Sequence, residues 1–370
     1  MKKTILAIAI PALFASAANA TVVYDKDGVT FDIYGRVQAN YYGDTNKSVA
    51  ATDGKYVLNE ETGAVDFKQG TPRGYADVDG ELKGSSRLGW SGKVQLDSIW
   101  SAFARTEWQI AAENSGYKTS DIDPRHIYVG FDGSQYGKIL FGQTDTAFYT
   151  NVVERTDIFN EWGSEANAYG GRQEGQVIYM GKWGGFFANA SYQTNDDSAE
   201  LTFGSDSNGK AVPLAAKLDK GYAAGLGYDF DFGLGLAAAY AKNDYKADAG
   251  VTGDKEDWAL VTSYTIGGFY FAGLYNESSI TVGNQEVDYN GYELAASYNV
   301  DAWTFLTGYN KSEIDGVQNN TSVVKGDIAD YTYLGAQYAF TSKLKAYTEY
   351  KINGIDKMDD EWTVAMQYNF

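Results

Sequence analysis

Apolar and polar residues alternate along most of the chain, and the last ten residues show this most clearly. Every even position from 362 to 370 is apolar, and every odd position is polar or small; the apolar residues are Trp362, Val364, Met366, Tyr368 and Phe370. A period of two is typical of a β-strand with one apolar and one polar face. The strand reaches a terminal aromatic residue, where a soluble protein usually frays. A closed membrane barrel pairs its last strand with its first, and we therefore expect a transmembrane β-barrel.

Sixteen segments share this character, and short and long connections alternate between them, as in outer-membrane barrels. We expect antiparallel strands at 28–43, 85–96, 99–113, 125–133, 137–145, 173–182, 185–195, 220–230, 233–243, 256–266, 269–278, 289–299, 302–311, 328–339, 343–353 and 360–370. The short turns contain glycine pairs or aspartate, as at 183–185, 229–231, 267–268 and 300–301. We expect no proline within a strand, because Pro72, Pro124 and Pro213 lie in or beside long connections.

The alternation assigns each strand residue to one of two faces. In the first strand Phe31, Ile33 and Val37 share the apolar face, and Arg36 lies on the polar face. The segment 125–133 breaks the rule, because Arg125 has the parity of its apolar neighbours. A subunit contact or packing inside the barrel would account for this, and the sequence leaves both open.

The first twenty residues have the features of a secretory signal. Lys2 and Lys3 precede an apolar run over 5–15, and Ala18 and Ala20 form a small-residue cleavage site. We expect residues 1–20 to be removed and residues 21–370 to form one barrel domain. The rest of the sequence contains no apolar stretch long enough for a spanning helix, yet it is rich in aromatic residues, as expected for girdles at two membrane interfaces.

Composition narrows the possible chemistry. The chain has no cysteine, which excludes disulfides and thiolate sites. Its formal net charge of −19 argues against nucleic-acid binding. The single histidine, His126, has no evident nucleophile beside it, and as the residue after Arg125 we expect it on the opposite face from that arginine, the lipid- or subunit-facing side. We therefore expect no enzyme activity, no cofactor and no metal site.

Charged residues instead gather on the inward face. Four arginines lie on or beside strands: Arg36, Arg87, Arg125 and Arg172. Three acids occupy the long connection 146–172: Asp157, Glu161 and Glu165. Taken singly, such charges are ordinary on a solvated surface, and alternation places at least Arg36 and Arg87 on the inward face.

Several motifs resemble those of the Gram-negative general-diffusion porins. The opening residues 22–28 with 32–36, the segments 87–90 and 107–110, and Arg125 with Gly130 resemble the first four strands of that family. Residues 157–163 resemble its constriction-loop motif, and Arg172 with Tyr179 resembles the strand that follows the loop. The terminal Phe370 resembles the family's outer-membrane assembly signal. The resemblance extends over the whole chain after the signal.

This resemblance implies a homotrimer of sixteen-stranded barrels in the outer membrane of a Gram-negative bacterium, in contact with lipid and lipopolysaccharide. The third extracellular loop would fold into each lumen. Arg36, Arg87, Arg125 and Arg172 match the family's basic wall, and Asp157, Glu161 and Glu165 match the acids of the loop. The implied function is passive diffusion of ions and small hydrophilic solutes.

Some positions depart from the family pattern. Asn160, Trp162 and Ser164 replace a proline, a phenylalanine and a glycine of the loop motif, so that Trp162 either narrows the pore or packs behind the loop. No glutamate near 114–116 matches the latch that related porins extend to a neighbouring subunit. A substrate-specific channel or a surface receptor is the alternative function, and an outer-membrane enzyme is less favoured because His126 has no partner.

Overall fold

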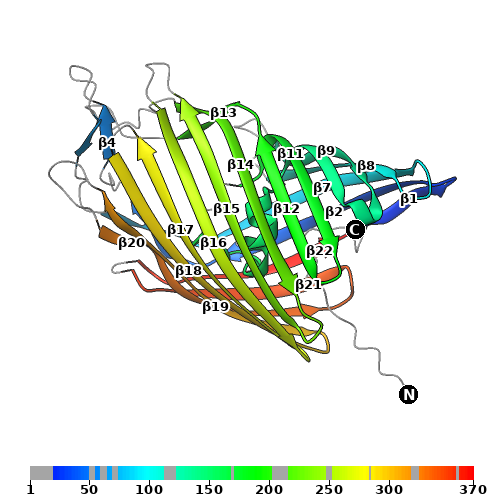
Figure 1. Cartoon of the computed structure of the whole chain (residues 1–370). Coiled ribbons are helices and arrows are strands. Elements are labelled where there is room, and N and C mark those ends of the chain that lie inside the picture. The colour runs from blue at the N-terminus through cyan, green and yellow to red at the C-terminus, as the bar shows by residue number, and fades with distance from the viewer. Residues whose placement is uncertain are drawn as a thin grey trace.

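A closed antiparallel sheet makes up most of the molecule (Figure 1). The computed structural model describes residues 20–49, 55–58, 65–68, 74–111, 122–167, 171–201, 216–246, 252–282, 285–317, 325–355 and 358–370. The barrel strands are β2 (Val29–Tyr42), β7 (Glu81–Gln95), β8 (Ser101–Ala111), β9 (Ile122–Asp132), β10 (Lys138–Thr144), β11 (Gln173–Trp183), β12 (Phe186–Gln193), β14 (Ala216–Asp229), β15 (Leu234–Lys246), β16 (Thr252–Ile266), β17 (Phe269–Val282), β18 (Gln285–Val300), β19 (Trp303–Val317), β20 (Lys325–Ala339), β21 (Leu344–Asn353) and β22 (Glu361–Asn369). All sixteen predicted strands are confirmed, with shifted ends.

Shorter elements lie between these strands. They are β1 (Thr21–Lys26), β3 (Thr45–Val49), β4 (Lys55–Leu58), β5 (Val65–Lys68), β6 (Gly74–Val78), β13 (Asp196–Leu201), the helix α1 (Ala147–Asn151) and the 3-10 helices η2 (Ser134–Tyr136) and η3 (Val153–Arg155). The connection between β2 and β7 contains two ribbons, β3 with β6 and β4 with β5, which alternation did not predict. No helix in the described part of the chain is long and apolar enough to cross a membrane.

The ring closes where β22 pairs with β2. In this pairing Arg36 lies opposite Asn369, and Tyr42 lies opposite Thr363. β1 pairs with the other half of β2, so that β1 and β22 follow one another along the same edge. The backbone of Phe370 exchanges hydrogen bonds of 3.0 and 3.1 Å with Gly35. The last strand thus pairs with the first, as the alternation predicts.

The tight turns have the backbone conformation that hairpins need. Gly184 (φ 61°) connects β11 to β12, and Gly267 (φ 59°) connects β16 to β17. Asp27 and Gly28, with φ of 57° and 77°, form the two-residue turn between β1 and β2. Positive φ at such positions matches the turn to the twist of the flanking strands. The turn after β14 runs from 230 to 233 and is longer than the predicted one.

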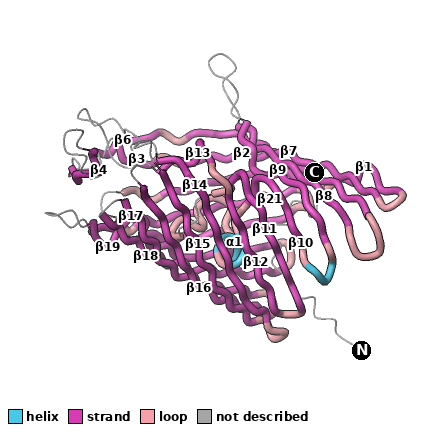
Figure 2. The backbone as a smooth tube through the Cα atoms, turned by 45° about the horizontal axis from the view of Figure 1, so that its top comes forward, coloured by secondary structure: helices cyan, strands magenta, loops and turns pink. Residues whose placement is uncertain are grey.

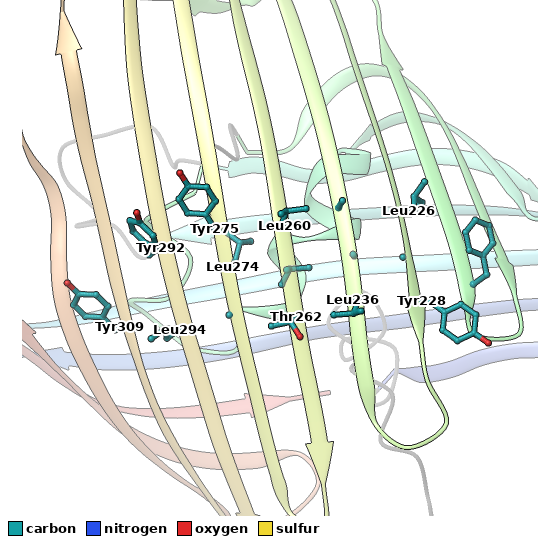
Figure 3. A pocket seen from close by; sticks show the side chains of 16 residues that line it. Leu226, Tyr228, Leu236, Leu260, Thr262, Leu274, Tyr275, Tyr292, Leu294 and Tyr309 are labelled. Atoms are coloured by element: carbon teal, nitrogen blue, oxygen red, sulfur yellow. The ribbon is translucent and has the colours of Figure 1, made fainter.

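The outer face carries an apolar band between aromatic rows. On β14–β18 the band contains Leu226, Leu236, Leu260 and Leu294, each 45–56% exposed. Tyr275, Tyr292 and Tyr309 flank it on one side and Tyr228 on the other, around a shallow apolar groove (Figure 3). An outward apolar band flanked by aromatic girdles is the lipid-facing surface of a membrane barrel.

Strand β9 departs from the prediction in two respects. It contains Pro124, which we expected outside any strand. The ladder between β8 and β9 skips Arg125, because Glu107 lies opposite His126 and Trp108 lies opposite Pro124. Such a bulge leaves one residue unpaired and bends the strand. Proline cannot donate a ladder hydrogen bond, and it is tolerated at a bulge because the ladder is already interrupted there.

The bulge explains the broken alternation. Beyond it, Ile127 and Val129 face outward and are 46% and 57% exposed. Arg125 still reaches the interior, where it contacts Glu107. His126 is 5% exposed and lies 2.9 Å from the Thr144 hydroxyl on the inner side. The prediction that His126 faces lipid or a subunit is therefore wrong.

Three expectations concern residues that the structure does not describe. The segment 114–116, where we found no latch glutamate, lies outside the described residues. The same holds for Pro72 and Pro213, and for residues 1–19 of the expected signal.

Candidate functional site

The segment between β10 and β11 lies inside the barrel rather than beyond its rim. Its helix α1 is seen through the nearer strands in Figure 2. Phe148, Val152 and Val153 of this segment are at most 2% exposed. They pack on inward-facing small residues of β14, β15 and β16, which include Ala223, Ala237, Ala239 and Ala259. Alanine at these inward positions leaves room for a helix against the wall. Longer polar side chains would fill that room.

Three inward glycines let the segment approach the strands closely. A Cβ at Gly225 would lie 2.6 Å from the side-chain carbon of Asn151. A Cβ at Gly235 would overlap the Arg155 guanidinium, and one at Gly291 would overlap the backbone oxygen of Ala166. These contacts with β14, β15 and β18 show that the segment follows the wall over several strands.

Two buried carboxylates fasten the segment. Glu293 on β18, which is 1% exposed, accepts hydrogen bonds from the Thr156 hydroxyl at 2.5 Å and the Ala166 N–H at 3.0 Å. Glu349 on β21, also 1% exposed, accepts from the N–H groups of Asn160 at 2.8 Å and Glu161 at 3.1 Å. Hydrogen bonds to a charged acceptor are stronger than those between neutral groups, so these residues define the path of the segment.

Arg155 fixes the beginning of the segment. Its guanidinium donates to Asp229 and Ser263, both at 2.8 Å. It also lies over the ring of Phe187, 5.3 Å from the centroid. The Tyr270 hydroxyl donates to the Arg155 backbone oxygen at 2.8 Å. Four strands therefore hold this one residue.

Trp162 packs behind the segment, which decides between the two predicted positions. It is 8% exposed and contacts Ala329, Tyr331 and Tyr333 on β20. The Tyr331 hydroxyl donates to the Trp162 backbone oxygen at 3.1 Å. The larger ring thus fills space between segment and wall and does not narrow the passage.

The three predicted acids have different surroundings. Asp157 accepts a hydrogen bond from Tyr149 of α1 at 2.8 Å. Burial raises the pKa of the Asp157 carboxyl, and this hydrogen bond offsets part of the rise. Glu165 is exposed, and its backbone N–H donates to Asn310 at 3.3 Å.

Glu161 is the most extensively bonded of the three. One oxygen accepts from Asn40 at 2.8 Å, from Gln38 at 3.2 Å and from Tyr347 at 2.5 Å. The other oxygen accepts from the Tyr42 hydroxyl at 2.8 Å. All four donors are neutral side chains, and through them β2 and β21 hold the Glu161 side chain in place.

The predicted basic residues come from the first half of the barrel and the approach to β11. Arg36 on β2 is directly opposite Arg87 on β7. Arg125 comes from the bulge of β9, and Arg172 immediately precedes β11. The segment is bonded to β14–β21 and, through Glu161, also to β2, whereas these arginines come from β2, β7, β9 and the approach to β11. The acidic segment and the arginine wall thus meet at β2, while Arg87, Arg125 and Arg172 come from other parts of the barrel.

Several charged residues of the site were not predicted. Glu107 contacts Arg105 and Arg125, and Asp145 lies 3.4 Å from Arg172. Lys345 donates to the Asn160 side chain at 2.7 Å. The parity of β8 places positions 105 and 107 on the inner face with Gln109, and that signal was available from the sequence.

Comparison with known proteins places these features in a family. The family model for Gram-negative porins matches residues 6–356. The chain is 28% identical to outer membrane porin N of Escherichia coli over 396 aligned residues, which cover 99% of this chain and 96% of the relative.

Solved structures show the same fold. Salmonella typhi OmpF in complex with daunomycin aligns with a TM-score of 0.71 at 19% identity, covering 95% of this chain and 100% of that one. The trimer form of OmpT from Vibrio cholerae aligns with a TM-score of 0.65 at 17% identity, covering 93% and 100%. The chain therefore belongs to the Gram-negative porin family and is an outer-membrane porin.

Proposed function

We propose that the barrel is a passive, water-filled channel for ions and small hydrophilic solutes, narrowed by the segment between β10 and β11. Its constriction comprises the basic residues Arg36, Arg87, Arg125 and Arg172 and the acids Asp157, Glu161 and Glu165. The observation that supports this most strongly is the fastening of the segment by Glu293 and Glu349. A loop held inside the lumen reduces the aqueous cross-section at a fixed height.

Opposite charges around a narrow aqueous passage create a transverse electric field. The low-dielectric wall strengthens that field relative to bulk water. A small polar solute aligns its dipole with the field and passes, whereas a bulky apolar solute disrupts ordered water and gains no compensating interaction. Selectivity then depends on radius and on rings of charge. The channel needs no dedicated binding pocket.

The functional unit that we propose is a homotrimer within lipid and lipopolysaccharide. One of the aligned structures is the trimer form of Vibrio cholerae OmpT. The outer positions of β7 and β8 support close subunit packing, because they include Gly84, Gly92, Ala102 and Ala104. Small residues let the backbones of neighbouring subunits approach each other in a membrane. Cross-linking of detergent-purified protein tests this, and a monomer as the largest species contradicts it.

We further propose that residues 1–20 are a removable signal and that residues 21–370 form one domain. The first described strand, β1, begins at Thr21, the residue after the expected cleavage site. This position supports cleavage before Thr21, because the ladder with β2 begins at that residue and continues the edge on which β22 pairs. N-terminal sequencing of outer-membrane protein tests the cleavage site. A chain that retains residue 1 contradicts it.

We propose no enzymatic role. His126 contacts the Thr144 hydroxyl, and its ladder partner Glu107 is engaged by two arginines. Among the residues that the structure describes, the acid opposite His126 is thus already paired and is not available to orient it as a general base. A substrate-specific channel remains the alternative to general diffusion, and it requires preferential passage of one solute class.

Liposome swelling distinguishes these two functions. Purified protein is incorporated into liposomes, and influx of neutral sugars and amino acids of graded size is measured. A general-diffusion channel gives rates that fall smoothly with solute size. Saturable influx of one solute, with exclusion of others of equal size, supports the alternative. The absence of any swelling contradicts both.

A further inference from the structure

The arginine wall contains its own carboxylates. Glu107 on β8 uses both side-chain oxygens, one for Arg105 and one for Arg125, each at 2.8 Å. Its side chain is only 5% exposed. Asp145, which is 3% exposed, lies 3.4 Å from Arg172. These acids belong to the barrel side of the constriction and not to the acidic segment.

Arg36 and Arg87 have different surroundings. They are neighbours across the β2–β7 ladder. Among the described residues, neither forms an ion pair with a carboxylate within 4.0 Å. The Nε atom of Arg87 donates instead to the neutral Gln109 at 2.6 Å. Among the barrel-wall residues that the structure describes, positive charge is therefore least neutralised at β2 and β7, and the acid nearest to it on β2 is Glu161 of the segment.

The two wall acids change the charge balance of the constriction. Five arginines line this side, but Glu107 and Asp145 reduce their combined charge to three positive units. The fields of fixed charges add, so a carboxylate among the arginines repels anions as a carboxylate on the segment does. Glu107 therefore affects permeation through the position of its charge in the lumen, in addition to holding Arg105 and Arg125 in place.

We propose that Glu107 is a selectivity-determining residue, which weakens the positive wall and shifts the channel toward cations. The proposal rests on the proposed channel function and deepens it, because it assigns part of the selectivity to the barrel wall. It also assigns the positive pole to Arg36 and Arg87. These two are the arginines with guanidinium groups not bonded to a described carboxylate.

The test is the reversal potential of single channels in a KCl gradient across a planar bilayer. Glu107→Gln removes one negative charge without changing side-chain size. We expect the ratio of cation to anion permeability to fall about two- to fivefold. This range is what Coulomb's law gives for a unit charge about 8 Å from the permeating ion in water, the smaller value with salt screening and the larger without it. Glu277→Gln is the matched control, since Glu277 lies on the outer face beside Tyr275. We expect that control to keep the wild-type ratio.

A double variant separates charge from distortion. Glu107→Gln alone leaves Arg105 and Arg125 next to one amide, which can shift both side chains. Glu107→Gln combined with Arg125→Gln restores the net charge, and we expect the permeability ratio to return close to the wild-type value. A ratio that stays at the single-variant value overturns the proposal, because distortion then explains the change.

The remaining outcomes are also decisive. A conducting Glu107→Gln channel with an unchanged permeability ratio overturns the proposal and leaves the channel function intact. Wild-type protein that never conducts overturns the channel function instead. Heat-dependent gel mobility confirms that each variant forms the folded barrel before it is recorded.

Discussion

Replacement of Glu349 by glutamine tests how the acidic segment is held. Glu349 accepts three hydrogen bonds: from the backbone N–H groups of Asn160 and Glu161 and from the Asn160 side chain at 2.9 Å. Glutamine keeps one acceptor oxygen, but its NH₂ group would face the N–H of Glu161. One hydrogen bond is therefore lost, and the other two lose their charged acceptor.

The expected magnitude follows from these contacts. A hydrogen bond to a charged acceptor contributes about 1.5–3 kcal/mol and a neutral one about 0.5–1.5 kcal/mol. One lost and two weakened bonds together cost about 3–5 kcal/mol of attachment at the tip of the segment. Because every 1.4 kcal/mol is tenfold, the detached tip becomes more populated by a factor of about 100 or more. Glu293 and the packing of α1 still hold the remainder.

Single-channel recording and liposome swelling measure the result. For Glu349→Gln we expect increased open-channel current noise and faster influx of larger sugars. Glu361→Gln is the matched control, because Glu361 pairs with Lys351 at 3.0 Å on the neighbouring strands and, among the described residues, forms no hydrogen bond or ion pair with the segment. If both variants match the wild type in noise and in solute exclusion, Glu349 does not restrain the tip and the reasoning is refuted.

Four further predictions concern the same lumen and its closure. Gly291→Ala should displace the segment, because the new Cβ overlaps Ala166; an unchanged sugar exclusion limit in swelling assays would count against this contact. Asp157→Asn with Glu161→Gln should lower the ratio of cation to anion permeability, and an unaltered reversal potential would remove both from the constriction. The pKa of Asp157 is raised above its ordinary 3.8, so its negative charge is lost as pH falls through a range above that value. Cation preference should decline there in the wild type but not in Asp157→Asn, and identical pH profiles would argue against the shift. Deletion of Phe370 should reduce the yield of heat-resistant barrel, because two backbone hydrogen bonds at the closure are lost; an equal yield on gels would show that they are dispensable.

The strand pattern was predictable because the two faces of each strand meet different solvents. Leu226, Leu260 and Leu294 face outward and the neighbouring Glu293 faces inward, as their alternation requires. Lipid on one side and water on the other impose a period of two on the sequence. The turns were predictable for a second reason: positions such as Gly184 need a positive φ that glycine adopts easily.

The contacts of the segment were not predictable in the same way. Glu293 and Glu349 follow the inward parity of their strands, as many polar residues do, and nothing local marks them as anchors. Their role depends on the route of a segment more than 120 residues away in sequence. The inward alanines Ala237 and Ala239 were a usable signal, since a water-filled lumen does not favour small apolar residues.

The bulge in β9 shows a different limit. The extra residue at the bulge lets Arg125 and His126 both face inward, so placing His126 opposite an inward Arg125 assigned it to the wrong face. Pro124 was the available sign of an irregular strand, because proline removes a ladder hydrogen bond. The resemblance of Arg125 to a pore-wall residue was a better guide to its direction than its parity.

The central claim is that the chain encloses a permanent aqueous passage through a membrane, with charges at its narrowest level. Single-channel recording of the purified protein in a planar bilayer tests it most directly. We predict stepwise conductance in KCl, with three equal levels for each inserted trimer. A membrane that stays at its background conductance, although folded protein has inserted, would contradict the claim.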